Sequence, residues 1–362
     1  MMFYFLYPLK DVSIFFNLFR YITFRAAAAS VTSFLFCLWL GPSLIEWLKK
    51  IRIVNHTERE HAQKIHHLYA GKKNVPTMGG LLIVSSVVSS MLLWGNLTHR
   101  YVWLLLLTMI WFGGVGFIDD WIKLKSKSSH GISSKAKILG QVGMALFIGV
   151  YLFFDPAFDR WLYLPFLKNS FVYLGWLYIP FTVLVLTGSS NALNLTDGLD
   201  GLAIGCTLFT TASLGIIAYF VGRVDFATYL SLPLIPEGGE IAVFCGALVG
   251  SSAGFLWFNS YPSEVMMGDT GSLALGAALG TIALLIKKEF VLIIVGGIFV
   301  WEALSVMIQV ASFKLTGKRV FLMSPFHHHL QLKGWPESKV TIRLWIISMI
   351  LSVIGLATMK VR

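Results

Sequence analysis

The chain has 362 residues, of which 56% are hydrophobic and only 13% are charged, and its mean hydropathy is +0.73. A soluble domain is about 45–50% apolar even with glycine counted, so this composition excludes an ordinary soluble protein and indicates a polytopic membrane protein. The net charge is +11, but no basic and aromatic nucleic-acid module is visible, so we expect no nucleic-acid partner. The three cysteines lie in apolar runs, which favours buried side chains over disulfides or a zinc site.

The apolar runs predict an all-α protein with a single transmembrane domain over residues 1–362. A helix needs about 20 apolar residues to cross a bilayer. The first run is interpreted as a span rather than a cleaved signal peptide, because apolar sequence continues to Trp47. Ten spans are predicted: 22–48, 75–98, 101–120, 136–154, 171–188, 201–221, 240–258, 270–286, 290–312 and 340–358.

Lysine and arginine are unevenly divided between the two ends of these spans. One end receives 18 of the 29 basic residues, and basic loops normally face the cytoplasm. With an even number of spans, both termini are then predicted to be periplasmic. The loops that carry polar motifs all fall on the cytoplasmic face: 49–74, 119–137, 189–200, 259–269 and 313–339. Because charge is costly in hydrocarbon, this convergence favours one shared site over scattered solvated helix ends.

The first polar motif is Asp119-Asp120, at the end of the third predicted span. On a continuing helix, Asp119 and Lys123 are four residues apart and share a face. The two carboxylates could hold a metal or take a proton while Lys123 contacts a phosphate. The alternative is a solvated helix end with a local ion pair, which would be the better interpretation if the motif stood alone.

Two further acidic motifs lie between later spans. In the segment 194–201, Asp197 and Asp200 are three residues apart, so one helical turn could aim both at one ligand. Asp269, in the segment 267–272, precedes the eighth span. Glycine-rich turns with an aspartate cap are the alternative in both places. That alternative explains one aspartate of the first motif comfortably and two less well.

The last motifs are a histidine run and a buried acid. His327, His328 and His329 are consecutive, and as cations or neutral donors they could bind a pyrophosphate. A solvated loop is the alternative, but three histidines on the acidic face favour function. Glu302 lies within the ninth span, where an acid indicates a functional role. Hydrogen bonding between helices is its rival explanation.

Together these motifs indicate magnesium and phosphate chemistry at one membrane face. Mg²⁺ usually takes one or two carboxylates and completes its shell with water and substrate phosphates. Three separated aspartate clusters, with lysine and histidine nearby, fit a diphosphate-linked substrate whose developing charge they would stabilise. The second substrate would come from the bilayer, which explains a site on a membrane domain.

The motifs resemble the signatures of a known family. The segments 119–123, 191–201, 255–259 and 267–272 resemble the polyprenyl-phosphate N-acetylhexosamine-1-phosphate transferases. Within that group, the segments 75–80 and 325–337 resemble the phospho-N-acetylmuramoyl-pentapeptide transferases. The resemblance runs from about Phe19 to Arg362.

The resemblance implies a reaction and a setting. UDP-N-acetylmuramoyl-pentapeptide would donate phospho-N-acetylmuramoyl-pentapeptide to undecaprenyl phosphate with Mg²⁺, giving lipid I and UMP. This is the first membrane step of peptidoglycan synthesis. It also implies ten helices in the bacterial inner membrane, external termini and a homodimer.

The resemblance also implies residue roles. Asp119 and Asp120 would lie at the lipid-phosphate side with Lys123 as a cationic partner, and Asp269 would be the metal ligand. His327, His328 and His329 would approach the diphosphate and sugar. The nucleoside side and remaining polar lining would comprise Asn194, Asp197, Gly198, Leu199, Asp200, Gln309, Met266, Lys72, Thr77, Lys135, Lys137 and Asn259. The family usually has phenylalanine at the position of Met266, where a ring can stack on uracil, and a thioether can also contact an aromatic face.

The expected mechanism is direct attack by the lipid phosphate. A phosphomonoester has a second pKa near about 6, so it is mostly dianionic at neutral pH and needs no strong base. Asp119 or Asp120 could take a residual proton and orient the acceptor. The competing mechanism makes one aspartate a covalent nucleophile. Two other functions stay open at this point: a sister transferase that uses UDP-N-acetylglucosamine, and a transporter with polar spans.

Overall fold

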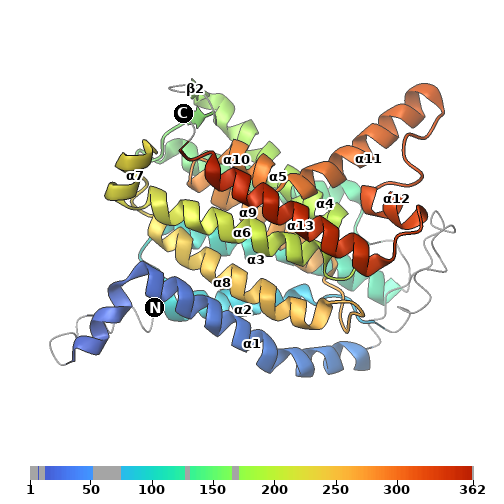
Figure 1. The fold of residues 1–362 in the computed structure, drawn as a ribbon, viewed down its shortest axis with the longest axis horizontal. Coiled ribbons are helices and arrows are strands. Elements are labelled where there is room, and N and C mark those ends of the chain that lie inside the picture. The colour runs from blue at the N-terminus through green and yellow to red at the C-terminus, as the bar shows by residue number, and fades with distance from the viewer. Residues whose placement is uncertain (1–6, 8–12, 52–74, 127–130, 165–170, 361–362) are drawn as a thin grey trace.

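Long helices that run side by side make up most of the protein (Figure 1). The computed structural model describes residue 7 and residues 13–51, 75–126, 131–164 and 171–360. In these ranges, nine helices are long and apolar enough to cross a membrane. They are α1 (Ile22–Lys50), α3 (Arg100–Ser126), α4 (Ser134–Phe154), α5 (Tyr178–Thr196, with η4 Gly175–Leu177 before it), α6 (Leu202–Val221), α8 (Gly238–Asn259), α9 (Gly268–Leu285), α11 (Gly297–Thr316) and α13 (Glu337–Ala357).

Shorter elements connect the long helices. They are η2 (Ile14–Arg20), α2 (Gly80–Trp94), α7 (Val224–Leu230), α10 (Glu289–Val295), α12 (Phe326–Leu332) and the antiparallel strands β1 (Trp161–Tyr163) and β2 (Phe171–Tyr173). The prediction of a mostly helical, polytopic membrane protein is confirmed. The small hairpin of β1 and β2 was not predicted.

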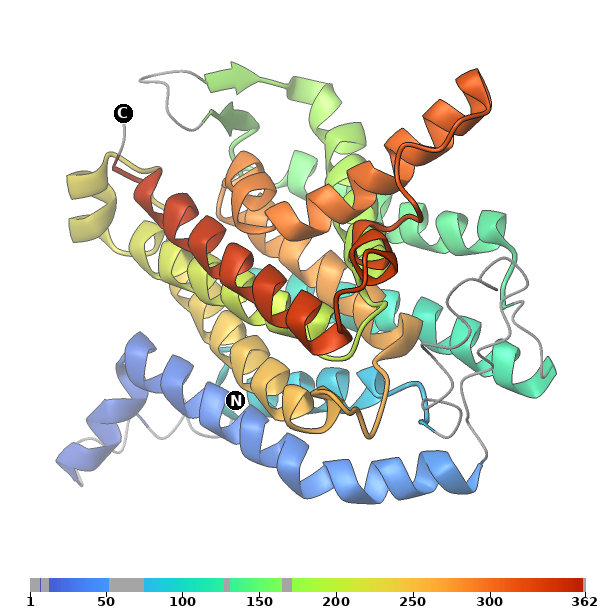
Figure 2. The ribbon, with the colours of Figure 1, turned by 45° about the vertical axis from the view of Figure 1, so that its right-hand side comes forward.

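Helix α9 forms the centre of the bundle and is almost wholly buried. Its small residues let neighbouring backbones come close, as is typical of helix packing in lipid. A Cβ on Gly80 of α2 would lie 2.1 Å from the Gly271 nitrogen, and one on Gly276 would lie 2.5 Å from the Ser189 oxygen of α5. Helices α1, α8, α6 and α13 lie side by side in that order (Figure 2). The far half of α11 projects away from the bundle.

The two ends of the bundle differ in character. The polar motifs lie where α3, α5, α8 and α11 end and where α4, α6, α9 and α13 begin. The opposite end carries α7 and the hairpin, and both η2 and the last turn of α13 lie on that side (Figure 1). The convergence of the motifs on one end is therefore confirmed. Which end faces the cytoplasm stays a prediction.

Three predicted spans differ most from the helices observed. The second, 75–98, shortens to the 15 residues of α2 because Met78 has a φ of 73° and Gly95 ends the helix. The fifth, 171–188, begins too early, since 171–173 form β2, and ends too early, since α5 continues to Thr196. The ninth, 290–312, is divided into α10 and α11 at Gly296.

Candidate active site

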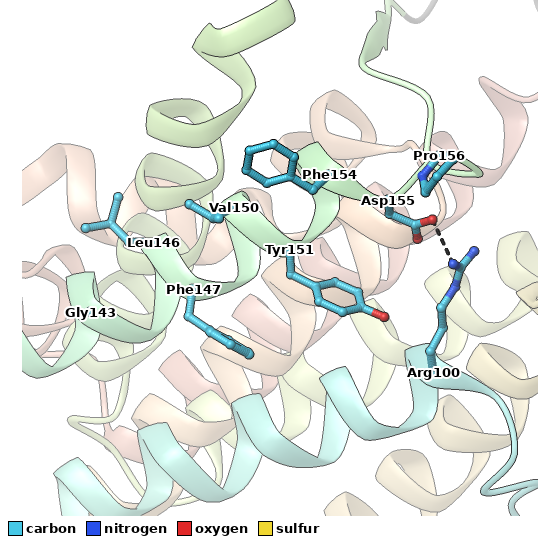
Figure 3. A pocket seen from close by; sticks show the side chains of 9 residues that line it. All are labelled: Arg100, Gly143, Leu146, Phe147, Val150, Tyr151, Phe154, Asp155 and Pro156. Atoms are coloured by element: carbon cyan, nitrogen blue, oxygen red, sulfur yellow. Dashed lines mark hydrogen bonds and ion pairs between the residues drawn. The ribbon is translucent and has the colours of Figure 1, made fainter.

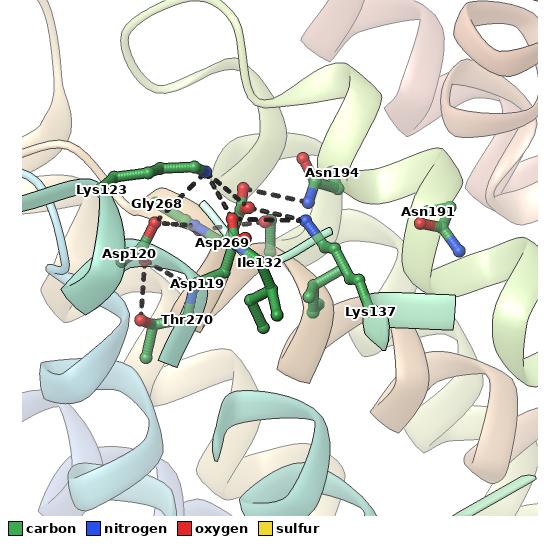
Figure 4. Close-up of polar contacts among 12 residues, drawn as sticks. Asp119, Asp120, Lys123, Ile132, Lys137, Asn191, Asn194, Gly268, Asp269 and Thr270 are labelled. Atoms are coloured by element: carbon green, nitrogen blue, oxygen red, sulfur yellow. Dashed lines mark hydrogen bonds and ion pairs between the residues drawn. The ribbon is translucent and has the colours of Figure 1, made fainter. Parts of the chain in front are cut away.

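Three carboxylates from two helices meet at one end of the bundle (Figure 4). Asp119 and Asp120 lie on α3, which continues six residues beyond the predicted span, and Asp269 lies in the first turn of α9. One oxygen from each lies within 4.8 Å of the others. Gly116 allows this approach, because a Cβ there would lie 2.2 Å from the backbone oxygen of Asp269. Gly116 lies one helical turn before the two aspartates of α3. This spacing is the sequence signal that could have indicated a close helix contact at Gly116.

Asp120 joins α3 to the beginning of α9. Its Oδ2 accepts hydrogen bonds from the backbone nitrogen of Thr270 at 3.0 Å and from the Thr270 hydroxyl at 2.8 Å. Its Oδ1 accepts from the backbone nitrogen of Asp269 at 3.3 Å. The first amides of a helix have no partner within the helix, so a carboxylate there is stabilised by hydrogen bonds and by the helix dipole. Thr270 was not predicted as part of the site.

Two lysines and an asparagine surround Asp269. Lys123 Nζ lies 2.9 Å from Asp269 Oδ2 and 2.5 Å from Asp119 Oδ2. Lys137 of α4 reaches Asp269 Oδ2 at 2.6 Å, and Asn194 of α5 donates to Oδ1 at 3.1 Å. Four helices therefore converge on one carboxylate. The predicted proximity of Asp119 and Lys123 on one helix face is confirmed.

The charges and donor atoms of this cluster fit a divalent cation. Three carboxylates here lie beside two lysine ammonium groups, so acidic side chains outnumber basic ones in the cluster. Carboxylate oxygens are the ligands that hard cations prefer, and Mg²⁺ needs only one or two of them from the protein. The carboxylates of Asp119, Asp120 and Asp269 could hold such an ion.

The turn after α5 brings a fourth acid to the cluster. Burial raises the pKa of Asp197 to about 7, and the nearby charges of Asp269 and Asp120 act in the same direction. A hydrogen bond from the Gly268 backbone opposes this shift. Asp197 is the residue at which α5 ends, and α6 begins after Gly201, whose φ of 72° suits glycine. Asn194 and Asp197 therefore lie near Asp269, in agreement with the expectation that these motifs share one site.

The histidine run forms the short helix α12 rather than an open loop. A Cβ on Gly198 would lie 2.3 Å from His327 Nε2, so α12 packs directly on the Asp197 turn. His327 is fully buried beside Glu302. His328 Nδ1 lies 2.9 Å from Gln331 Oε1, and His329 Nδ1 accepts a hydrogen bond from the Leu322 backbone. The structure thus places one histidine, His327, against the acidic turn.

Several residues predicted to contact substrate make hydrogen bonds to the chain's own backbone in this structure. Asn259 joins Gly201 to Val265, and Asp200 accepts from Ser263. Gln309 binds the backbone of 320–321.

The backbone of Met266 bonds to Pro76 and Gly79, which holds Thr77 beside Gly268. Leu199 is buried, Lys135 is exposed, and Lys72 lies outside the described residues. Substrate contact by these residues stays a prediction.

A hollow on the described surface lies between Arg100 at the beginning of α3 and the side chains of α4 (Figure 3). It has a volume of about 660 Å³ and is lined mainly by apolar side chains of α4. At its rim, Arg100 donates to Asp155 at 2.7 Å. Arg100 and Asp119 are 19 residues apart on α3, which is about 28 Å along the helix axis. This hollow is therefore separate from the carboxylate cluster.

Comparison with known proteins identifies the class of enzyme. Residues 102–287 match the model of glycosyl transferase family 4, and they include all three carboxylates of the cluster.

Curated relatives match the whole chain. The phospho-N-acetylmuramoyl-pentapeptide-transferase of Desulfotalea psychrophila is 50% identical over 100% of both chains. The protein of that name from Desulforapulum autotrophicum is 49% identical over 100% of both, and that from Methylacidiphilum infernorum is 48% identical over 96% of both. This chain belongs to the phospho-N-acetylmuramoyl-pentapeptide transferases.

The close approach at Gly116 gives a prediction with a matched control. We expect Gly116→Ala to lower both turnover and thermal stability, because its methyl group would push the Asp269 backbone away from α3. The expected cost is about 1–3 kcal/mol in stability. Gly114→Ala serves as the control, since a Cβ there meets nothing within 4 Å. Thermal unfolding and initial rates would be compared for both variants, and equal behaviour would contradict the packing argument.

Proposed function

We propose that this chain transfers phospho-N-acetylmuramoyl-pentapeptide from UDP-N-acetylmuramoyl-pentapeptide to undecaprenyl phosphate, giving lipid I and UMP. The transfer itself is the activity of the family to which the chain belongs. We further propose that the reaction depends on Mg²⁺ and takes place at the cytoplasmic face of the bacterial inner membrane. The homodimer stays a prediction.

The carboxylate and lysine cluster at one end of the membrane helices carries this proposal. It combines a place for a divalent cation with two ammonium groups. These positive charges would stabilise the negative charge of a diphosphate and a phosphate acceptor. Its position at the end of the bundle lets a water-soluble donor and a lipid acceptor meet. A transporter would instead hold its site near the midplane.

The residues of the cluster would have different roles in the reaction. When bound, Mg²⁺ would neutralise phosphate charge, with Asp269 as the principal ligand. Lys123 and Lys137 lie within reach of the same carboxylate and would turn toward substrate phosphates. Asp119 would orient the acceptor phosphate. Its Oδ2 is paired with Lys123, and the side chain of Lys123 is one-third exposed, so it can move away and free this oxygen. Asp120 would keep α3 and α9 in register.

The test is UMP release by the purified full-length protein in detergent. We expect release to require UDP-N-acetylmuramoyl-pentapeptide, undecaprenyl phosphate and Mg²⁺ together, and EDTA to stop it until Mg²⁺ is restored. A lipid-linked product should form in equal amount. Release with UDP-N-acetylglucosamine and not with the pentapeptide donor would favour the sister transferase and refute this proposal.

A further inference from the structure

The side chain of Glu302 meets His327 twice. Glu302 lies in α11 and is fully buried, as is His327 of α12. The backbone nitrogen of His327 donates to Oε1 at 3.2 Å and to Oε2 at 3.3 Å. The ring nitrogen Nδ1 lies 3.2 Å from Oε2, an ion-pair separation. The carboxylate therefore contacts both the backbone and the ring of one residue.

The opposite ring nitrogen is directed at the acidic turn. A Cβ on Gly198 would lie 2.3 Å from Nε2 of His327, so this nitrogen faces the residue that follows Asp197. Within the part of the chain that the structure describes, both ring nitrogens are buried and neither makes a hydrogen bond, but only Nδ1 has a carboxylate oxygen at ion-pair distance. A buried polar atom is costly without a partner. Because Glu302 lies beside Nδ1, Nε2 beside the cluster is the ring nitrogen left for a ligand.

The chemistry of the pair determines which nitrogen carries a proton. A carboxylate can only accept hydrogen bonds, and a buried carboxylate is costly unless it is paired. Nδ1 lies 3.2 Å from Oε2, so it is the ring nitrogen placed to donate to Glu302. Carboxylates fix the tautomer and orientation of histidines in this way at many sites.

We propose that Glu302 is a positioning residue, which keeps Nδ1 of His327 protonated and Nε2 directed at the donor phosphates beside Asp197. This inference rests on the proposed function for the identity of the ligand, a nucleoside diphosphate sugar. It assigns Glu302 a part in the reaction rather than only in helix packing.

Glu302→Gln separates the two roles. Glutamine keeps the size of the side chain and an oxygen for the His327 backbone, but it removes the charge that holds the Nδ1 proton. We expect kcat to fall about 10–100-fold with little change in the KM of the donor, as is typical for the loss of such a partner. Glu302→Asp retains the carboxylate and should recover part of the rate.

Ser305→Ala is the matched control. Ser305 is buried one turn further along α11, and its hydroxyl donates to the backbone oxygen of Glu302 at 2.7 Å. This variant removes a buried polar group from the same helix without touching His327, and we expect wild-type kinetics. If Glu302→Gln and Ser305→Ala behave alike, the positioning role is refuted.

A direct measurement does not depend on turnover. Nitrogen-15 NMR of protein labelled at the histidine rings would report which nitrogen of His327 is protonated, with its signals assigned by their loss in His327→Gln. We expect protonated Nδ1 in the wild type and a changed pattern in Glu302→Gln. An unprotonated Nδ1 in the wild type overturns the inference even if Glu302→Gln does not fold. Absent UMP release by the wild type would instead refute the proposed function and leave the NMR result standing.

Discussion

Replacing Asp269 with asparagine should reduce Mg²⁺-dependent UMP release about 10³-fold or more. The carboxylate is the point at which Lys123, Lys137 and Asn194 converge, and it is the proposed metal ligand. Asparagine has nearly the same size, but it lacks the charge and turns a donor toward the lysines. Loss of one main stabiliser of transition-state charge costs about 4 kcal/mol, which corresponds to about 10³-fold in rate. Initial rates at saturating substrates would measure it.

The control for this variant makes the same chemical change elsewhere. Asp225→Asn alters an exposed aspartate of α7, at the opposite end of the bundle, which forms an ion pair with Arg223. We expect wild-type turnover from it. The Asp269→Asn protein should still unfold cooperatively on heating, which would show that it is folded. Wild-type activity in Asp269→Asn would remove this residue from the proposed site.

Hydropathy predicted the helical membrane fold well, because the cost of polar backbone in lipid leaves few alternatives to helices. Hydropathy failed to predict the secondary structure where local backbone geometry determines it. The run at 171–173 is as apolar as a span, but its aromatic and β-branched residues pair as a strand with 161–163. The polar end of α5 was excluded on hydropathy, although Asn191 and Asn194 face partners inside the bundle. Hydropathy also cannot locate the break at Gly296.

The site was predicted at the level of motifs and less well at the level of single contacts. Loop positions and charge bias showed that Asp119, Asp197 and Asp269 would gather at one end. Sequence could not show whether a polar side chain faces substrate or backbone. Asn259 and Gln309 both bind backbone groups, since amide side chains both donate and accept. Thr270 was missed for the related reason that its role depends on where α9 begins.

The hydrogen bonds of the two adjacent aspartates bear on the choice between direct attack and a covalent intermediate. A nucleophilic carboxylate needs an available oxygen. Both oxygens of Asp120 accept hydrogen bonds from the first turn of α9. These hydrogen bonds would have to break if Asp120 attacked the substrate. Asp119 accepts from the Ile132 backbone through Oδ1, and Lys123 neutralises its Oδ2. These contacts weaken both groups as nucleophiles and favour attack by the lipid phosphate itself.

Direct attack makes UMP release strictly dependent on the acceptor. With UDP-N-acetylmuramoyl-pentapeptide and Mg²⁺ but no undecaprenyl phosphate, we expect no burst of UMP and no change in the intact mass of the protein. A covalent route would instead release one equivalent of UMP per active site and leave the phospho-sugar on an aspartate. Rapid quenching followed by mass spectrometry measures both quantities in one sample. An adduct on Asp119 or Asp120 would refute direct attack, and it would require Lys123 or the α9 amides to release an oxygen before chemistry.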